Sequence, residues 1–182
     1  MDFCKVHDFR ESQKIEEEGF ERQDRFYIEH FGKLPTRIPW EEDMEFQRGD
    51  RDLKIEYFGE EIIVSEKNRT EDYTDTAFEI WSVFPNKTGW SMHSYAKLLC
   101  YFLPSSVMIV NMEDMVKILT ENKISRQVGW YYDNHRYLDI WINGVFYFVP
   151  VIRAQNKSYS SICIAFTDEQ LKQLGVRFKR II

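Results

Sequence analysis

The sequence predicts an α/β fold with a mixed sheet, followed by a C-terminal extension rich in β-hairpins. A charged helix-type segment opens the chain, three β-type runs follow, and helix-type and strand-type segments then alternate over residues 92–122. The last third instead holds β-rich runs separated by turn residues. Alternating helices and strands are typical of mixed or parallel sheets, whereas consecutive strands joined by tight turns form antiparallel ones.

One long or twice-broken amphipathic helix is expected over residues 8–31. This segment lacks proline and places apolar side chains at roughly helical spacing among many charges, and Gly32 ends it. An irregular connection with two prolines leads to two β-type runs, residues 52–58 and 60–67, which a glycine joins as a hairpin. A third strand is expected over residues 76–82.

The middle of the chain predicts the order helix, strand, helix. Residues 92–103 have the composition of a helix that ends before Pro104. The apolar run 106–110 predicts a short, fully buried strand. Asn111 then stands where an N-cap residue would precede a helix over residues 112–122.

The C-terminal third carries the strongest local signal. An Asn-Gly pair at 143–144 divides the β-rich stretch 138–152, which is typical of a two-residue hairpin turn. Another strand is expected over residues 159–166. Thr167 and Gln170 have the spacing of a capping box, so a last short helix should follow.

Length and composition favour one domain. The chain has 182 residues, of which 43% are hydrophobic and 16% aromatic, so it can bury a sizeable core. We expect a core over residues 1–125 and a β-rich extension of the same domain over 126–182. The formal charge of -6 excludes a molecule-wide basic field for binding phosphate backbones, so any nucleic-acid role needs a local basic patch or a partner.

The cysteines and the N-terminus predict a cytoplasmic protein. Cys4, Cys100 and Cys163 are odd in number and far apart, which indicates neither a disulfide framework nor a metal knuckle. The N-terminus is charged and lacks an apolar signal region, and no stretch approaches the length of a membrane span. We therefore expect no membrane partner and a location in the cytoplasm.

Four polar residues on the predicted strands form the main candidate site. Alternation along a strand puts Ser65 and Lys67 on one face. A hairpin that pairs residue 52 with residue 67 would bring Asp52 close to Lys67. Glu79 lies inside an apolar strand, where a carboxylate needs a strong reason to be buried. A divalent cation, Mg²⁺ or Mn²⁺, would supply that reason. We expect the strand of Glu79 to lie beside the strand over residues 60–67, so that Asp52 and Glu79 hold the ion from the ends of adjacent strands, with Lys67 beside it.

This order of elements and residues is similar to that of the PD-(D/E)XK nuclease superfamily, whose restriction-endonuclease-like core has the order αβββαβ. The family motif is an Asp, a gap, and then Asp or Glu two residues before Lys. Here Ser65 stands two residues before Lys67, which resembles a variant whose second carboxylate has migrated to a glutamate about a dozen residues later, at Glu79. The resemblance implies that Asp52 and Glu79 hold metal, that Lys67 orients water or stabilises charge on phosphate, and that Ser65 supports them.

The stretch from residue 47 to 102 also resembles small proteins of phages and mobile elements of Gram-positive bacteria, which implies that the cytoplasm is that of a bacterial host cell. The resemblance implies a metal-dependent phosphodiesterase that cuts DNA or RNA, acting with or on a nucleoprotein such as a Cas effector with its CRISPR guide RNA. An alternative is a non-catalytic inhibitor, such as an anti-CRISPR, with a degenerate nuclease fold. A structural protein of a phage or plasmid is a third.

Each candidate residue also has a plainer interpretation. Lys67 could be a solvated edge lysine, and Asp50, a weaker candidate, could be a turn residue. Glu66 could face solvent, or it could be the real ligand if a bulge shifts the register by one residue. Gln47 is a further weak candidate in the same stretch.

Overall fold

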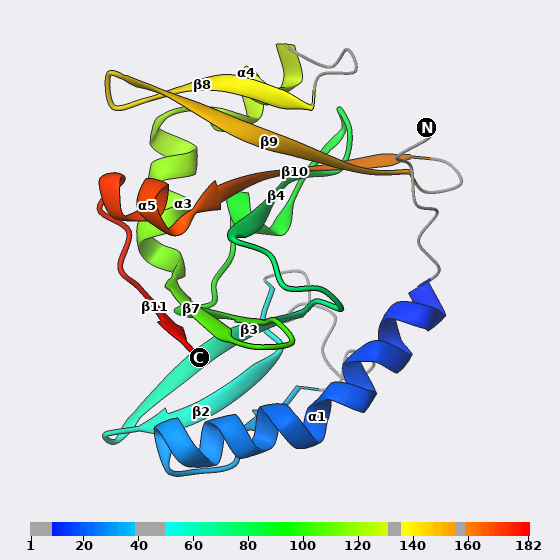
Figure 1. The fold of residues 1–182 in the computed structure, drawn as a ribbon, viewed down its shortest axis with the longest axis vertical. Helices are drawn as coiled ribbons and strands as arrows, with labels where there is room; N and C mark the ends of the chain where they lie inside the picture. The colour runs from blue at the N-terminus through cyan, green and yellow to red at the C-terminus, as the bar shows by residue number, and fades with distance from the viewer. Residues whose placement is uncertain (1–8, 39–49, 131–135, 156–158) are drawn as a thin grey trace. The chain divides into compact units, whose positions relative to one another are not determined.

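The computed structural model describes residues 9–38, 50–130, 136–155 and 159–182. The described chain forms two compact units that interleave along the sequence (Figure 1). Unit 1 contains residues 74–93 and 114–177, and unit 2 contains the remaining described residues. The expected division at residue 125 therefore falls inside unit 1.

Unit 2 is a mixed sheet with one long helix. Its sheet has the strand order β1-β2-β3-β6-β7-β11, in which β3 and β6 are parallel and the other neighbours are antiparallel. This confirms the expected α/β class with a mixed sheet. The elements are α1 (Phe9–Phe31), β1 (Thr36–Arg37), β2 (Leu53–Tyr57), β3 (Glu60–Asn68), β6 (Leu98–Phe102), β7 (Val107–Asn111) and β11 (Phe178–Ile181).

The predicted first helix is confirmed, and its last turns cover one face of this sheet. Phe26 and Tyr27 of α1 are almost fully buried against the strands. Their rings contact Phe102 of β6 edge-on, with centroids 5.3 and 6.2 Å away. The cluster is completed by apolar residues of β2, β3, β6 and the start of β7: Leu53, Ile55, Ile62, Val64, Cys100 and Val107.

The predicted β2–β3 hairpin is confirmed, but its expected register was wrong by two residues. Phe58 and Gly59 both have positive φ, 51° and 81°, as a two-residue turn of the primed type requires. The turn pairs Tyr57 with Glu60 and hence Leu53 with Val64. Continued beyond the strand, this register sets residue 52 level with 65, and 50 level with 67. A slip of two residues keeps every side chain on its expected face.

The described part of unit 1 is an antiparallel sheet with the strand order β5-β4-β10-β9-β8, together with three short α-helices and the 3₁₀ helix η1. The C-terminal hairpin, the following strand and the Thr167–Gln170 capping box are confirmed. Helix α3 begins in unit 2 and continues in unit 1. The elements are β4 (Asp75–Val83), β5 (Lys87–Thr88), η1 (Trp90–Met92), α3 (Met112–Glu121), α4 (Ile124–Trp130), β8 (Tyr137–Ile142), β9 (Val145–Gln155), β10 (Ser160–Thr167) and α5 (Asp168–Gln173).

Two expectations about the middle of the chain were wrong. The third strand exists as β4, but it pairs with β10 and β5 and not with β3. The helix expected over residues 92–103 is absent, because η1 ends at Met92 and residues 98–102 form β6. Strand β6 is almost entirely buried between two strands, so it needs a continuous apolar run, which periodicity alone does not distinguish from a buried helix. None of the described helices is both long and apolar enough to span a membrane.

Candidate functional site

A lysine between two aspartates closes the open end of the β2–β3 hairpin in unit 2. Lys67 Nζ donates to Asp50 Oδ1 at 2.9 Å and to Asp52 Oδ2 at 3.4 Å. Asp50 is buried and has a φ of 58°, in the left-handed region that aspartate tolerates better than most residues. Its other oxygen accepts a hydrogen bond from Ser94 Oγ at 3.2 Å. The sequence prediction of contact between Asp52 and Lys67 is confirmed, but Asp50 is the closer partner.

Asp52 is fixed by the neighbouring strand. Its Oδ2 atom accepts hydrogen bonds from the backbone N–H of Glu66 at 2.7 Å and from Ser65 Oγ at 3.1 Å. Ser65 is fully buried, so its hydroxyl is held in place by packing. The structure thus brings together Asp52, Ser65 and Lys67, three of the four main candidates.

The charges of this cluster perturb one another. Burial acts to lower the pKa of Lys67, but attraction from Asp50 and Asp52 outweighs it and holds that pKa well above its usual value. Burial raises the pKa of Asp50, and the ammonium of Lys67 only partly offsets this effect. Lys67 is therefore a permanent cation at neutral pH.

A second charged group lies on the α1 face of the same sheet. Glu66 alternates with Ser65 and Lys67 along β3, so it points to the opposite face. Arg37 of β1 donates to Glu66 Oε2 at 2.6 Å and to Asp24 Oδ1 of α1 at 2.7 Å. The guanidinium thereby connects helix α1 to strand β3.

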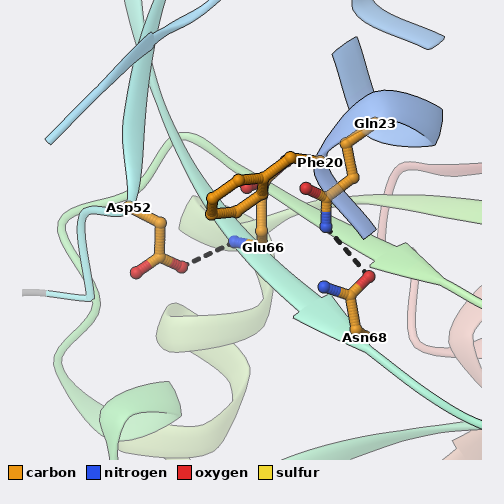
Figure 2. Close-up of a pocket in the computed structure, with 5 residues that line it drawn as sticks. All are labelled: Phe20, Gln23, Asp52, Glu66 and Asn68. Atoms are coloured by element: carbon orange, nitrogen blue, oxygen red, sulfur yellow. Dashed lines mark hydrogen bonds between the residues drawn. The ribbon is translucent and has the colours of Figure 1, made fainter. Parts of the chain in front are cut away.

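The two groups share a small pocket of about 50 Å³ (Figure 2). Its lining consists of one ring, two carboxylates and two side-chain amides, from Phe20, Asp52, Glu66, Gln23 and Asn68. The amides of Gln23 and Asn68 are joined by a hydrogen bond of 2.9 Å. The pocket is large enough for a water molecule or a small ion.

Glu66 brings an unsatisfied oxygen to this pocket. Its side chain is only 8% exposed, and its Oε1 atom accepts no hydrogen bond of normal geometry from the described residues. Burial raises the pKa of Glu66, and the charge of Arg37 only partly offsets this effect. The Tyr27 hydroxyl is close enough to influence the carboxyl electrostatically. A buried carboxylate whose second oxygen has the nearby Tyr27 hydroxyl as its one potential donor among the described residues can also bind a cation or an ordered water.

The donor set fits a hard cation. Mg²⁺ prefers oxygen ligands and is commonly held by one or two carboxylates plus waters and substrate phosphates. Asp52 and Glu66 supply two carboxylates, whereas the amide oxygens of Gln23 and Asn68 already accept hydrogen bonds from Arg37 and Gln23. Among the described residues, no group of three or more His, Cys, Asp and Glu side chains is placed to hold a metal. Any cation in this pocket would therefore depend on two carboxylates.

Glu79 lies elsewhere, on β4 in the sheet of unit 1. The expectation that its strand lies beside β3 was wrong. Its Oε2 atom accepts hydrogen bonds from Ser82 Oγ at 2.9 Å and from the backbone N–H of Trp90 at 3.3 Å, at the start of η1. Its backbone carbonyl accepts from Ser91 Oγ. These contacts give Glu79 a local structural role. Gln47 lies outside the described residues.

Sequence reasoning did not identify the polar residues that surround Glu66. Arg37 lies on a two-residue strand with no periodicity to detect, and Asp24 and Gln23 stand in a helix with many polar residues. Glu66 itself was only a weak candidate. No protein-family model, no curated protein and no solved structure matches this chain.

Proposed function

We propose that unit 2 is a metal-dependent phosphodiesterase that cuts DNA or RNA, with its site at the open end of the β2–β3 hairpin. The observation that carries the proposal is the pocket shared by Asp52 and Glu66, because Asp52 also accepts a hydrogen bond from the ammonium of Lys67. In this proposal Glu66, and not Glu79, is the second carboxylate.

The order of elements in unit 2 supports a PD-(D/E)XK-like core. Helix α1 is followed by the antiparallel strands β1, β2 and β3, and then by β6, which is parallel to β3. The family's order is αβββαβ, so one helix between the third and fourth strands is missing. Residues 69–97, all of them described, contain strands and the short η1 in its place.

Each residue of the site has a role in the proposal. Asp52 and Glu66 would hold the ion, Arg37 orients Glu66, and Asp50 keeps the ammonium of Lys67 beside Asp52. A bound Mg²⁺ would polarise a phosphate and lower the pKa of a bound water. The fixed positive charge of Lys67 would stabilise negative charge that develops on the phosphate.

The proposal is tested by incubating the full chain with labelled single-stranded and double-stranded DNA and RNA, with Mg²⁺, with Mn²⁺ and with EDTA. We expect metal-dependent cleavage that Asp52→Asn and Lys67→Met reduce by more than a hundredfold. The matched control is Lys97→Met, because Lys97 is an exposed lysine of unit 2 paired with Glu60. Equal cleavage by Lys67→Met and Lys97→Met would rule out the assigned site.

Metal binding gives a readout that does not depend on cleavage. We expect Mn²⁺ titrated into the wild type, followed by its electron paramagnetic resonance signal, to bind at one site. Asp52→Asn and Glu66→Gln should each weaken this binding at least about tenfold, because each removes one of two carboxylates. Unchanged Mn²⁺ binding in Glu66→Gln would remove Glu66 from the proposal.

A second candidate function is non-catalytic inhibition of a nucleic-acid-handling protein, such as a Cas effector. Two observations favour it: two carboxylates already neutralise Lys67, and the chain carries a net charge of -6. It predicts that the chain inhibits a CRISPR effector's DNA cleavage, and that this inhibition survives the double change Asp52→Asn with Lys67→Met. Inhibition that disappears with cleavage activity would instead support the enzyme.

A further inference from the structure

The β8–β9 hairpin of unit 1 is labelled in Figure 1. One face of this hairpin carries exposed aromatic side chains. The register pairs Trp141 with Phe146 and Asp139 with Phe148. The Trp141 and Phe146 rings meet edge-on with centroids 4.3 Å apart, and Tyr137 stacks on Phe148 at 4.8 Å. We call this surface the hairpin aromatic face and define it by its members: Tyr137, Trp141, Phe146, Phe148 and Ile152.

Strand alternation explains why these side chains share a face. The residues between them, Leu138, Ile140 and Ile142 on β8 and Tyr147 and Val149 on β9, are buried and form the core side of the sheet. A strand pair with one solvated face normally carries polar residues there. The members of the hairpin aromatic face are instead large and apolar and are 44–66% exposed.

The size of the surface is that of an interface. With about 200 Å² of surface for a large aromatic side chain, the five members expose about 500 Å² together. Apolar patches of this size on soluble proteins mark interaction sites. If two copies bury this face against each other, they remove about 1,000 Å² from water, the lower bound for a specific interface, before any contact around its rim is included.

The edge of β8 is not the contact, because a side chain already occupies part of it. The amide of Gln127 on α4 donates to the carbonyl of Trp141 at 2.8 Å and accepts from its N–H at 2.7 Å. Asn122 Oδ1 likewise accepts from the N–H of Asn143 at 2.9 Å. An added strand would need these backbone groups, so a partner must dock on the face.

Charge decides between nucleic acid and protein as the occupant. Bases can stack on exposed aromatic rings, but such sites combine the rings with basic residues that bind the phosphates. The hairpin aromatic face has no basic member, and Asp139 lies at its centre, opposite Phe148. A negative centre repels phosphates, so a protein is favoured over a nucleic acid as the occupant.

We propose that a second copy of this chain docks on the hairpin aromatic face, so that the protein forms a two-fold symmetric dimer. A second copy fits this face, because it presents an apolar surface of the same area. Asp139, between the two aromatic pairs, then lies within the contact on each copy. This inference concerns unit 1 and does not rest on the phosphodiesterase proposal.

The test is sedimentation velocity of the full chain over a range of concentrations. We expect the mass to rise from that of one chain, 22.0 kDa, towards twice that value. Phe146→Glu and Phe148→Glu should each raise the dimer dissociation constant at least about tenfold, because each places two like charges in the contact. The matched control is Phe58→Glu, because Phe58 is a 90% exposed phenylalanine in the turn of unit 2.

Asp139→Asn supplies a change in the opposite direction. It removes one negative charge from the contact on each copy, so the dimer should tighten by about threefold or more. A wild type that stays monomeric at every concentration, or a dimer that Phe146→Glu and Phe148→Glu leave intact, would overturn the proposal. A third outcome also overturns the dimer: the protein is monomeric, it binds a labelled single-stranded oligonucleotide in an anisotropy measurement, and Phe146→Glu and Phe148→Glu lose this binding. The occupant of the face is then nucleic acid. Circular dichroism verifies that each variant is folded.

Discussion

Asp50 and Lys67 meet across the open end of the β2–β3 hairpin, with 2.9 Å between the carboxylate oxygen and the ammonium nitrogen. The carboxylate side chain is 4% exposed and the lysine side chain 27%. A buried charge that loses its partner keeps its desolvation cost without the attraction that offset it. The pair is therefore expected to matter for stability as well as for any activity.

Lys67→Met should lower the free energy of unfolding by about 2–4 kcal/mol at pH 7, because it leaves Asp50 buried without its cation. The loss should shrink as the pH falls, because Asp50 is then protonated in the folded protein. Urea unfolding measures both effects. The control Lys97→Met breaks an exposed pair with Glu60 and should cost less than about 1 kcal/mol. Equal losses for the two variants would contradict this account.

Glu66→Gln should change how stability depends on pH. Because burial raises the pKa of Glu66 in the folded protein above its ordinary value of 4.5, the folded state binds more protons than the unfolded state between those two values. The contribution of Glu66 to stability is therefore full below pH 4.5 and declines as the pH rises through the folded pKa. Glutamine does not ionise, so the stability of the variant relative to wild type should increase with pH across this range.

Urea unfolding at several pH values from 4 to 7 checks this expectation. Glu61→Gln, which changes an exposed glutamate of the same strand, is the control and should show no such trend. A difference between Glu66→Gln and wild type that stays constant with pH would mean that Glu66 ionises normally.

Cys100 should resist thiol reagents in the folded protein. Burial raises its pKa to about 12, and the side chain is fully enclosed by the core of unit 2. The raised pKa lowers the fraction of reactive thiolate, and the enclosure keeps the reagent away from the sulfur. Iodoacetamide labelling at pH 8, read by peptide mass spectrometry, should modify Cys100 only after denaturant is added, and more slowly than the half-buried Cys163. Rapid labelling of Cys100 without denaturant would show that the core opens.

Gly89→Ala should destabilise unit 1 by about 1–3 kcal/mol or more through overpacking. A Cβ atom at residue 89 would come within 2.2 Å of the backbone oxygen of Glu79, which cannot move aside as a flexible side chain could. Gly129→Ala is the control, since its Cβ would meet only ordinary contacts at 3.9 Å. Thermal unfolding of the two variants gives the comparison. If Gly89→Ala were as stable as Gly129→Ala, β4 would not be held against Gly89 as described.

Local signals predicted the elements whose partners are close in sequence. The β2–β3 hairpin, the β8–β9 hairpin and the capping box of α5 each depend on residues within a few positions of one another. Strand β6 was expected to be a helix because what makes it a strand is its parallel pairing with β3, more than 30 residues away. Its own sequence, rich in Leu, Tyr and Phe, suits either structure.

In the candidate site, too, the contacts between residues close in sequence were predictable and the long-range ones were not. Alternation along β3 correctly grouped Ser65 with Lys67, and the hairpin brought Asp52 to them even though the register was two residues off. The position of Glu79 depends on which sheet accepts β4, and no local pattern encodes that choice. Arg37 reaches Glu66 through the packing of β1 and α1, which is likewise a long-range effect.

The interleaving of the two units limits how this protein can be cut or shortened. Over the described residues the chain passes between them near residues 73, 93, 113 and 177, so no single cleavage separates one unit from the other. Truncation before residue 178 removes β11 and leaves the N–H and C=O groups of β7 without that partner. Domain dissection by a single truncation would therefore yield two incomplete fragments, and each half of the molecule is best studied by substitution within the whole chain.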